Sequence, residues 1–140
     1  MAKRPKGLDA HLKRLARLYG PEGTRLVDQA IFVGADEIRV EAQISITTGS
    51  VSGAGHVPSL PGQPPNNDTG TLANFINVEH RAGSLKATVR SDATYSADLE
   101  FGTSKMAERP FMRPARDKKK SEVKRLVQQA MNKAVKGSGT

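Results

Sequence analysis

Residues 47–71, TTGSVSGAGHVPSLPGQPPNNDTGT, constrain the fold of this 140-residue chain more than any other segment. The segment holds five glycines and four prolines among serines, threonines and asparagines, a composition that opposes both helix and strand. We therefore predict a long loop that divides the chain into two parts. Loops beyond about 12–15 residues are usually functional or disordered. Extended at roughly 3.3 Å per residue, this loop is long enough to lie across a neighbouring subunit, and an ordinary surface loop is the alternative.

Two helices are predicted before the loop. A stripe of apolar residues from Leu8 to Tyr19 follows helical spacing and predicts a helix over 8–19. Pro21 suits the first turn of a second helix, in which apolar or small residues recur every four positions. The segment EIRVEAQISI, residues 37–46, also alternates with the period of a strand. Periodicity alone leaves helix and strand open for that segment.

The part after the loop mixes strand and helix signals. Apolar and polar side chains alternate on both sides of the connection RAG at 81–83, which predicts a β-hairpin over 72–91. Residues 95–101 predict a short helix ending before Gly102, and residues 114–136 predict a final helix with Pro114 in its first turn. These elements predict a single α+β domain over residues 1–140, with N-terminal helices, a small antiparallel sheet, the long loop and a packed C-terminal helix.

Composition excludes several kinds of site. The chain has no cysteine, which removes disulfides and thiolate metal sites and suits a reducing compartment. No apolar run has the length of a membrane span, so we expect a soluble protein made in the cytoplasm, with no membrane partner. The histidines at 11, 56 and 80 lack the spacing of metal ligands. Asp98 and Glu100 diverge on a helical turn and are interpreted as solvated or ion-paired acids. We expect no enzyme and no cofactor.

Charge is distributed unevenly along the chain. Residues 1–25 carry a net charge of +5, residues 26–102 carry −5 and residues 103–140 carry +8. Basic residues crowd the start of the final helix, where positive charge opposes the helix dipole. They are Arg113, Arg116, Lys118, Lys119, Lys120, Lys124 and Arg125. A solvated face, contact with DNA phosphates and contact with an acidic partner are the three interpretations of this basic run.

Two segments carry a family resemblance. PSLPGQPPNNDTGTL at 58–72 and YSADLEFGTSKMAERPFMRPA at 95–115 closely resemble the tail-completion, or head-to-tail joining, proteins of long-tailed bacteriophages and prophages. The resemblance implies a small α+β fold whose second helix extends over 21–44, and it implies no enzymatic activity. It also implies assembly into a ring, commonly a hexamer, through which double-stranded DNA passes. The neighbours in the particle would be a head-closure or adaptor ring and the tail terminator.

The resemblance assigns roles to two groups of residues. Residues 99–114 would form an elbow that orients the final helix, with Leu99 and Phe101 anchored in the core, Gly102 in a left-handed conformation and two prolines fixing the angle. The elbow residues are Leu99, Phe101, Gly102, Arg109, Pro110, Phe111, Met112 and Pro114. Phe111 and Met112 would either complete the core, which we favour, or plug a neighbour. The assembly-loop residues are Pro58, Pro61, Pro64, Pro65, Asp68 and Gly70.

The leading hypothesis is a virion structural protein of the neck or tail top, present in the host cytoplasm during assembly. In it the loop and the elbow contact adjacent subunits, while the basic residues of the final helix face the DNA lumen or an acidic partner. The alternative is a basic protein that binds nucleic acid without sequence specificity, because the isoelectric point is near 10.1 and both ends are basic.

Overall fold

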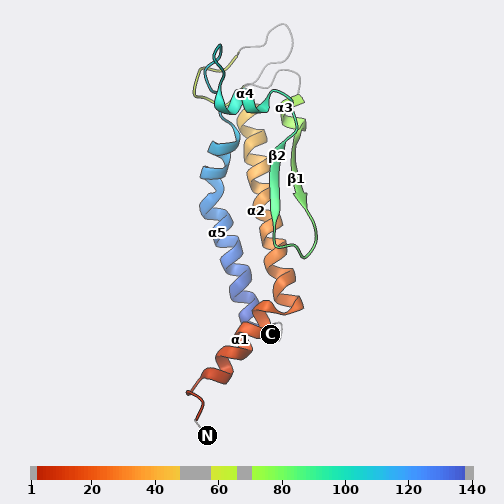
Figure 1. The fold of residues 1–140 in the computed structure, drawn as a ribbon, viewed down its shortest axis with the longest axis vertical. Coiled ribbons are helices and arrows are strands. Elements are labelled where there is room, and N and C mark those ends of the chain that lie inside the picture. Colours follow the sequence, from red (N-terminus) through yellow and green to blue (C-terminus); the bar gives the residue numbers. More distant parts are fainter. Residues whose placement is uncertain (1–2, 48–57, 66–70, 138–140) are drawn as a thin grey trace.

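The computed structural model describes residues 3–47, 58–65 and 71–137. In chain order the elements are α1 (Leu8–Tyr19), α2 (Pro21–Thr47), α3 (Thr71–Asn74), β1 (Ile76–His80), β2 (Ala87–Ser91), α4 (Ser96–Phe101) and α5 (Met112–Lys136). Long helices with a two-stranded antiparallel sheet confirm the predicted α+β class. The described part is elongated: α5 and the hairpin flank α2, α4 lies at one end, and α1 projects at the other (Figure 1).

Helix α2 includes the segment 37–46, whose periodicity is compatible with both helix and strand. It continues to Thr47, three residues beyond the predicted end at 44. Ala42 and Ile46, four positions apart, are buried in the core, and Ile38 packs against the same cluster. Val40 and Ile44, which strand pairing would have placed on the same face as these residues, are exposed. The four-residue period therefore prevails, because α2 buries one helical stripe.

Helices α2 and α5 pack closely near the middle of α2. Gly34 is buried, and a Cβ atom built on it would lie 2.9 Å from Cγ1 of Val123 on α5. A side chain at position 34 would therefore require Val123 or one of the two helices to shift. The largest fully buried side chains are Phe111, Ile46 and Ile76, which come from the start of α5, from α2 and from β1. The core thus joins α2, α5 and the hairpin near the α4 end of the molecule.

The hairpin begins later than predicted. Residues 71–74, predicted as strand from residue 72, form the single helical turn α3, and β1 pairs with β2 from Ile76↔Ser91 to His80↔Ala87. Leu72 and Ala73 are buried in this turn, so their apolar character reflects a buried helical turn and not a strand face. The connection spans 81–86 instead of 81–83, which removes Leu85 from the strand. Leu85 has a positive φ of 55° there.

A buried carboxylate on α2 holds this connection in place. Asp28 accepts hydrogen bonds from the backbone N–H groups of Gly83 (2.9 Å) and Leu85 (2.8 Å), and its Oδ2 lies 3.0 Å from Nε2 of His80. The Gly83 N–H group, His80 and the Leu85 N–H group lower the pKa of Asp28, although burial opposes the shift. Asp28 thus attaches the hairpin to α2, which explains why the connection is longer than a tight turn.

Other element bounds agree closely with the prediction or differ by a few residues. Helix α1 spans the predicted range 8–19. Helix α4 begins at Ser96, one residue late, and α5 begins at Met112, two residues before the predicted start at Pro114. Thr47 and Thr71, predicted as the ends of the loop, belong to α2 and α3. Within the loop, residues 58–65 are described, whereas Asp68 and Gly70 lie outside the described residues.

Candidate functional site

The elbow between α4 and α5 is built around Glu100. This residue is 6% exposed, and its carboxylate lies against the first turn of α5. Oε2 accepts the backbone N–H groups of Phe111 (2.8 Å) and Met112 (3.0 Å), and Oε1 accepts that of Arg113 (2.9 Å). The next residue, Pro114, has no N–H group to satisfy. The four N–H groups that a helix start normally leaves without partners are therefore all accounted for by one carboxylate and one proline.

The charge of Glu100 suits this position. Burial raises the pKa of Glu100, but the N–H groups of Phe111, Arg113 and Met112, with the Arg113 guanidinium, lower it by more, so the pKa lies below its ordinary value. A negative charge at a helix N-terminus is also favoured by the helix dipole. Glu100 therefore compensates at this position for the basic residues that begin α5.

The turn between α4 and Glu108 requires Gly102. Its φ is 75° with an extended ψ of 173°, so the predicted positive φ is present, but the backbone is not in the left-handed helical region. The Gly102 N–H donates to Asp98 O, and the Arg109 N–H donates to Leu99 O at 2.6 Å. A Cβ at position 102 would lie 2.9 Å from the Glu108 nitrogen. The LEFG segment thus closes into a turn that only glycine fits.

The predicted elbow residues divide into a buried and an exposed group. Phe111 is fully buried, and Leu99 and Met112 pack against the core, which confirms the core interpretation for these three. Phe101, predicted to be a core anchor, is 69% exposed, and that prediction is wrong. Residues two apart on a helix point in widely different directions, so a turn that directs Leu99 to the core directs Phe101 outward. The guanidinium of Arg113 lies over the Phe101 ring, 5.4 Å from its centre.

The described part of the assembly loop is attached to the elbow. The Gly62 N–H donates to Glu108 O (2.9 Å), and Arg109 Nε donates to Ser59 O (3.2 Å). Pro58 and Pro61 are exposed, Pro64 is half-buried and Pro65 is buried. Leu60, in the same segment, is 66% exposed. The structure therefore brings the two predicted groups, elbow and loop, together at one end of the molecule.

Most of the predicted basic run is engaged in ion pairs within the chain. Arg113 contacts Glu100 and Glu108 at 3.2 Å each, and Lys118 Nζ lies 2.7 Å from Glu41 of α2. Arg116 pairs with Asp117, and Arg125 pairs with Glu122. Lys119, Lys120 and Lys124 make no ion pair with a carboxylate of the described residues. The run therefore offers fewer free cations to a phosphate partner than its sequence indicates.

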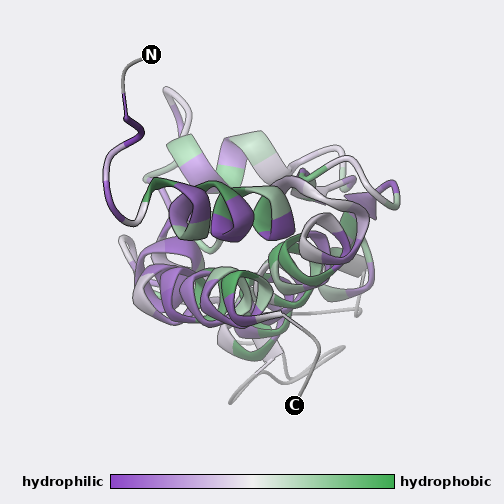
Figure 2. Cartoon of the chain, turned by 90° about the horizontal axis from the view of Figure 1, so that it is seen from below, coloured by the Kyte–Doolittle hydropathy of each residue, from purple (hydrophilic) through white to green (hydrophobic). Residues whose placement is uncertain are grey.

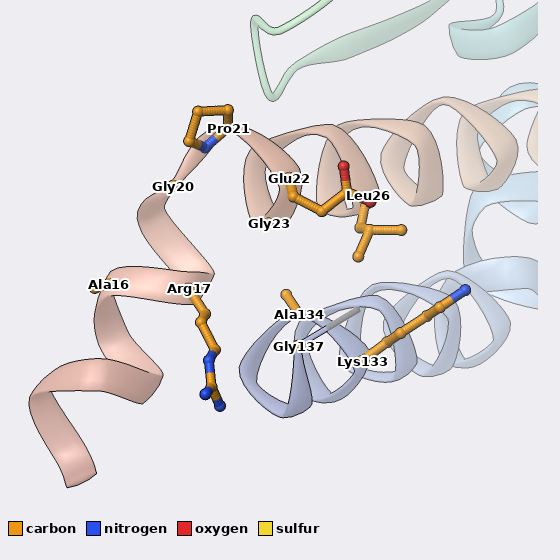
Figure 3. Close-up of a pocket in the computed structure, with 10 residues that line it drawn as sticks. All are labelled: Ala16, Arg17, Gly20, Pro21, Glu22, Gly23, Leu26, Lys133, Ala134 and Gly137. Carbon is orange, nitrogen blue, oxygen red and sulfur yellow. The ribbon is translucent and has the colours of Figure 1, made fainter. Parts of the chain in front are cut away.

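A cavity lies at the opposite end, where α1, α2 and α5 meet. It has a volume of about 420 Å³, and its lining includes Ala16, Pro21, Leu26 and Ala134, with Arg17 and Lys133 as the basic members (Figure 3). Arg17 reaches from α1 to the end of α5, where its guanidinium donates to Val135 O (3.3 Å). A cation at a helix C-terminus is favoured by the dipole, so Arg17 attaches α1 to α5.

Metal-ligating side chains do not gather in the part of the chain that the structure describes. Within residues 3–47, 58–65 and 71–137, no three His, Cys, Asp or Glu side chains come together to hold a metal ion. No described helix combines the length and the apolar character that a bilayer crossing requires. No family model, curated protein or solved structure matches this chain.

Sequence reasoning misses the two carboxylates that organise the fold. Glu100 is interpreted from the sequence as a solvated or ion-paired acid, and its pairing with Arg113 is observed, but its burial and its capping role were not predicted. A signal was present, because a helix start with Pro114 and no Ser, Thr, Asp or Asn at its N-cap needs an acceptor from elsewhere. Asp28 interrupts the apolar face of α2 and gave no comparable local signal.

Proposed function

We propose that this chain is a virion structural protein that completes the tail or neck of a bacteriophage-type particle and joins head to tail by ring assembly around the DNA channel. The motifs at 58–72 and 95–115, which resemble tail-completion proteins, lie in segments that are hydrogen-bonded to each other at one end of the molecule. A resemblance carried by two separate segments is better supported when the segments meet in space. This contact carries the proposal.

The chemistry of the elbow end supports assembly. Phe101 and Leu60 expose large apolar side chains on a backbone that Glu100, Gly102 and Arg109 hold in one conformation. A rigid exposed aromatic residue binds a protein partner at low cost in conformational entropy. We propose that these side chains contact adjacent subunits or the neighbouring head-closure and tail-terminator proteins.

The test uses particles whose copy of this gene is replaced by variants. Combining Phe101→Ser with Leu60→Ser should lower the yield of joined particles by at least about tenfold, with filled heads and separate tails accumulating. Leu85→Asn is the matched control, because Leu85 is similarly apolar and exposed but lies on the hairpin connection, and Asn tolerates its positive φ. Equal yields for the two variants would contradict the proposal.

The isolated protein provides a second test. We expect sedimentation velocity to show mainly monomer, with the ring forming on contact with its neighbours in the particle. A tight hexamer in free solution that salt does not dissociate would contradict assembly triggered by the particle.

A further inference from the structure

Seven of the fourteen Lys and Arg side chains that make no ion pair among the described residues lie at the end of the molecule opposite the elbow. We define the basic pole as residues 3–25 together with 133–137, that is, the segment 3–7, α1, the first turn of α2 and the end of α5. These described residues hold nine Lys and Arg side chains and two carboxylates. The cations are Lys3, Arg4, Lys6, Lys13, Arg14, Arg17, Arg25, Lys133 and Lys136. Figure 2 views the molecule from this end, with α1 lying across it.

The two carboxylates of the pole are already occupied. Asp9 pairs with Arg4 at 2.8 Å, and Glu22 pairs with Arg25 at 2.6 Å. Lys3, Lys6, Lys13, Arg14, Lys133 and Lys136 make no ion pair with a carboxylate of the described residues. With Arg17, which bonds to a backbone carbonyl, seven of the nine cations of the pole are thus without an ion pair, whereas four of the seven cations in the basic run of α5 are paired. The unpaired cations therefore concentrate at the pole and not along the run that the sequence singled out.

Two different helices supply these cations to one surface. On α1, Lys13 and Arg14 lie on the face that also holds Arg17, because positions 13, 14 and 17 fall within about 100° on a helix. Arg17 bonds to Val135 O near the end of α5, which places that face beside the last turn carrying Lys133 and Lys136. Helix α1 is about 18 Å long, enough to follow several successive phosphates of a duplex.

We propose that the basic pole binds the phosphate backbone of double-stranded DNA without reading its sequence. The closely spaced charges of a duplex match a row of unpaired cations, and their binding releases condensed counterions. Tyr19 is the one Phe, Tyr or Trp side chain of the pole, so the stacking platform that single-stranded nucleic acid needs is absent from its described residues. The proposed site is independent of ring assembly, because it is complete on one copy of the chain.

An anionic membrane is the competing ligand for a basic amphipathic helix. Of the large apolar residues of α1, only Leu12 and Tyr19 are exposed, while Leu8, Leu15 and Leu18 are half-buried. The exposed apolar area is too small for stable insertion into a bilayer, and α1 has no Trp or Phe. Charge without an insertable apolar face favours DNA.

The test compares two double variants of the purified protein binding a fluorescent duplex of about 25 base pairs, with anisotropy measured from about 25 to 150 mM KCl. We expect weak binding by the single chain, with a Kd on the order of 10–100 µM near physiological salt. Each phosphate contact adds about 0.9 to the slope of log K against log salt, so Lys13→Gln with Arg14→Gln should lower the slope by about 1.8. Lys120→Gln with Lys124→Gln should leave the slope unchanged.

Several results would overturn the proposal. The slope of log K against log salt could fall more for the Lys120 and Lys124 variant than for the Lys13 and Arg14 variant, or it could fall equally for both. Either result would mean that the basic run of α5 contacts the DNA. Binding to phosphatidylserine vesicles without binding to DNA would assign the pole to membranes. Because none of the four side chains carries an ion pair among the described residues, both variants should fold, which circular dichroism checks. Failure here leaves the particle test above unaffected, so the two proposals can be judged separately.

Discussion

The carboxylate of Glu100 at the end of α4 accepts the backbone N–H of Phe111 at 2.8 Å, across eleven residues of sequence. The same carboxylate accepts the N–H groups of Met112 and Arg113. One side chain therefore fixes where α5 begins and how it leaves the elbow. Because Phe111 is the largest fully buried side chain, this contact also couples the elbow to the core.

Replacing Glu100 by Gln should lower the free energy of unfolding by about 2–3 kcal/mol, because a neutral amide loses charge-assisted bonds and turns an N–H₂ group toward backbone donors. Urea unfolding followed by circular dichroism measures the change. Glu108→Gln is the control: Glu108 is exposed and pairs with the same Arg113, and its loss should cost less than about 1 kcal/mol. Similar losses for the two variants would show that the Arg113 ion pair, and not the helix cap, carries the effect.

Acid should destabilise the protein partly through Glu100. Its folded-state pKa lies below the ordinary value of 4.5, so its contribution is fully present above that value and is lost as pH falls through the folded-state pKa. The difference in unfolding free energy between the native protein and Glu100→Gln should therefore shrink as pH falls from about 5 toward about 3. Asp28→Asn should behave alike below its ordinary value of 3.8. A difference that stays constant with pH would contradict the assignment of the charged form.

The spacing of apolar residues predicted the helices whose buried face is set by their own sequence. Helix α1 matches its predicted range, and the four-residue period of α2 is the one the structure buries. The start of the hairpin was predicted wrongly because Leu72 is buried in a single helical turn. Over so few residues, a buried helical turn and a strand have similar patterns of apolar residues. The connection was predicted too short because Asp28, more than fifty residues earlier, holds its N–H groups.

The candidate site was predictable in its position and not in its contacts. The motifs located the elbow, and its glycine is required as expected. Pairing partners that are remote in sequence could not be read from composition, so Lys118 was assigned to DNA or a partner although Glu41 of α2 lies 2.7 Å away. The sequence gives the number of basic residues in the run, but the number that lack an ion pair can be known only from the three-dimensional structure.

Truncation of the two phenylalanines of the elbow should lower the free energy of unfolding by very different amounts, because Phe111 is buried and Phe101 is exposed. Phe111→Ala leaves a cavity in the core and should cost about 3–5 kcal/mol, whereas Phe111→Leu keeps most of the volume and should cost about 1–1.5 kcal/mol. Phe101→Ala removes an exposed ring and its contact with Arg113, at a cost below about 1 kcal/mol. Urea midpoints give all three values. If Phe101→Ala lowered the free energy of unfolding as much as Phe111→Ala does, Phe101 would have to be part of the core.

Two glycines with positive φ allow the cost of the backbone conformation to be measured apart from the cost of a steric clash. Gly62 has a φ of 82° with nothing within 4 Å of an added Cβ, so Gly62→Ala should cost about 1 kcal/mol for the conformation alone. At Gly102 the added Cβ would meet the Glu108 nitrogen at 2.9 Å and the Met106 oxygen at 3.0 Å. Both are backbone atoms and cannot rotate away, so Gly102→Ala should cost about 2–4 kcal/mol. Urea unfolding measures both variants, and hydrogen exchange at the Arg109 amide, which bonds to Leu99 O, should accelerate only in Gly102→Ala. Equal costs for the two variants would mean that the elbow yields to a side chain, and a turn that yields in this way could not hold α5 at a fixed angle.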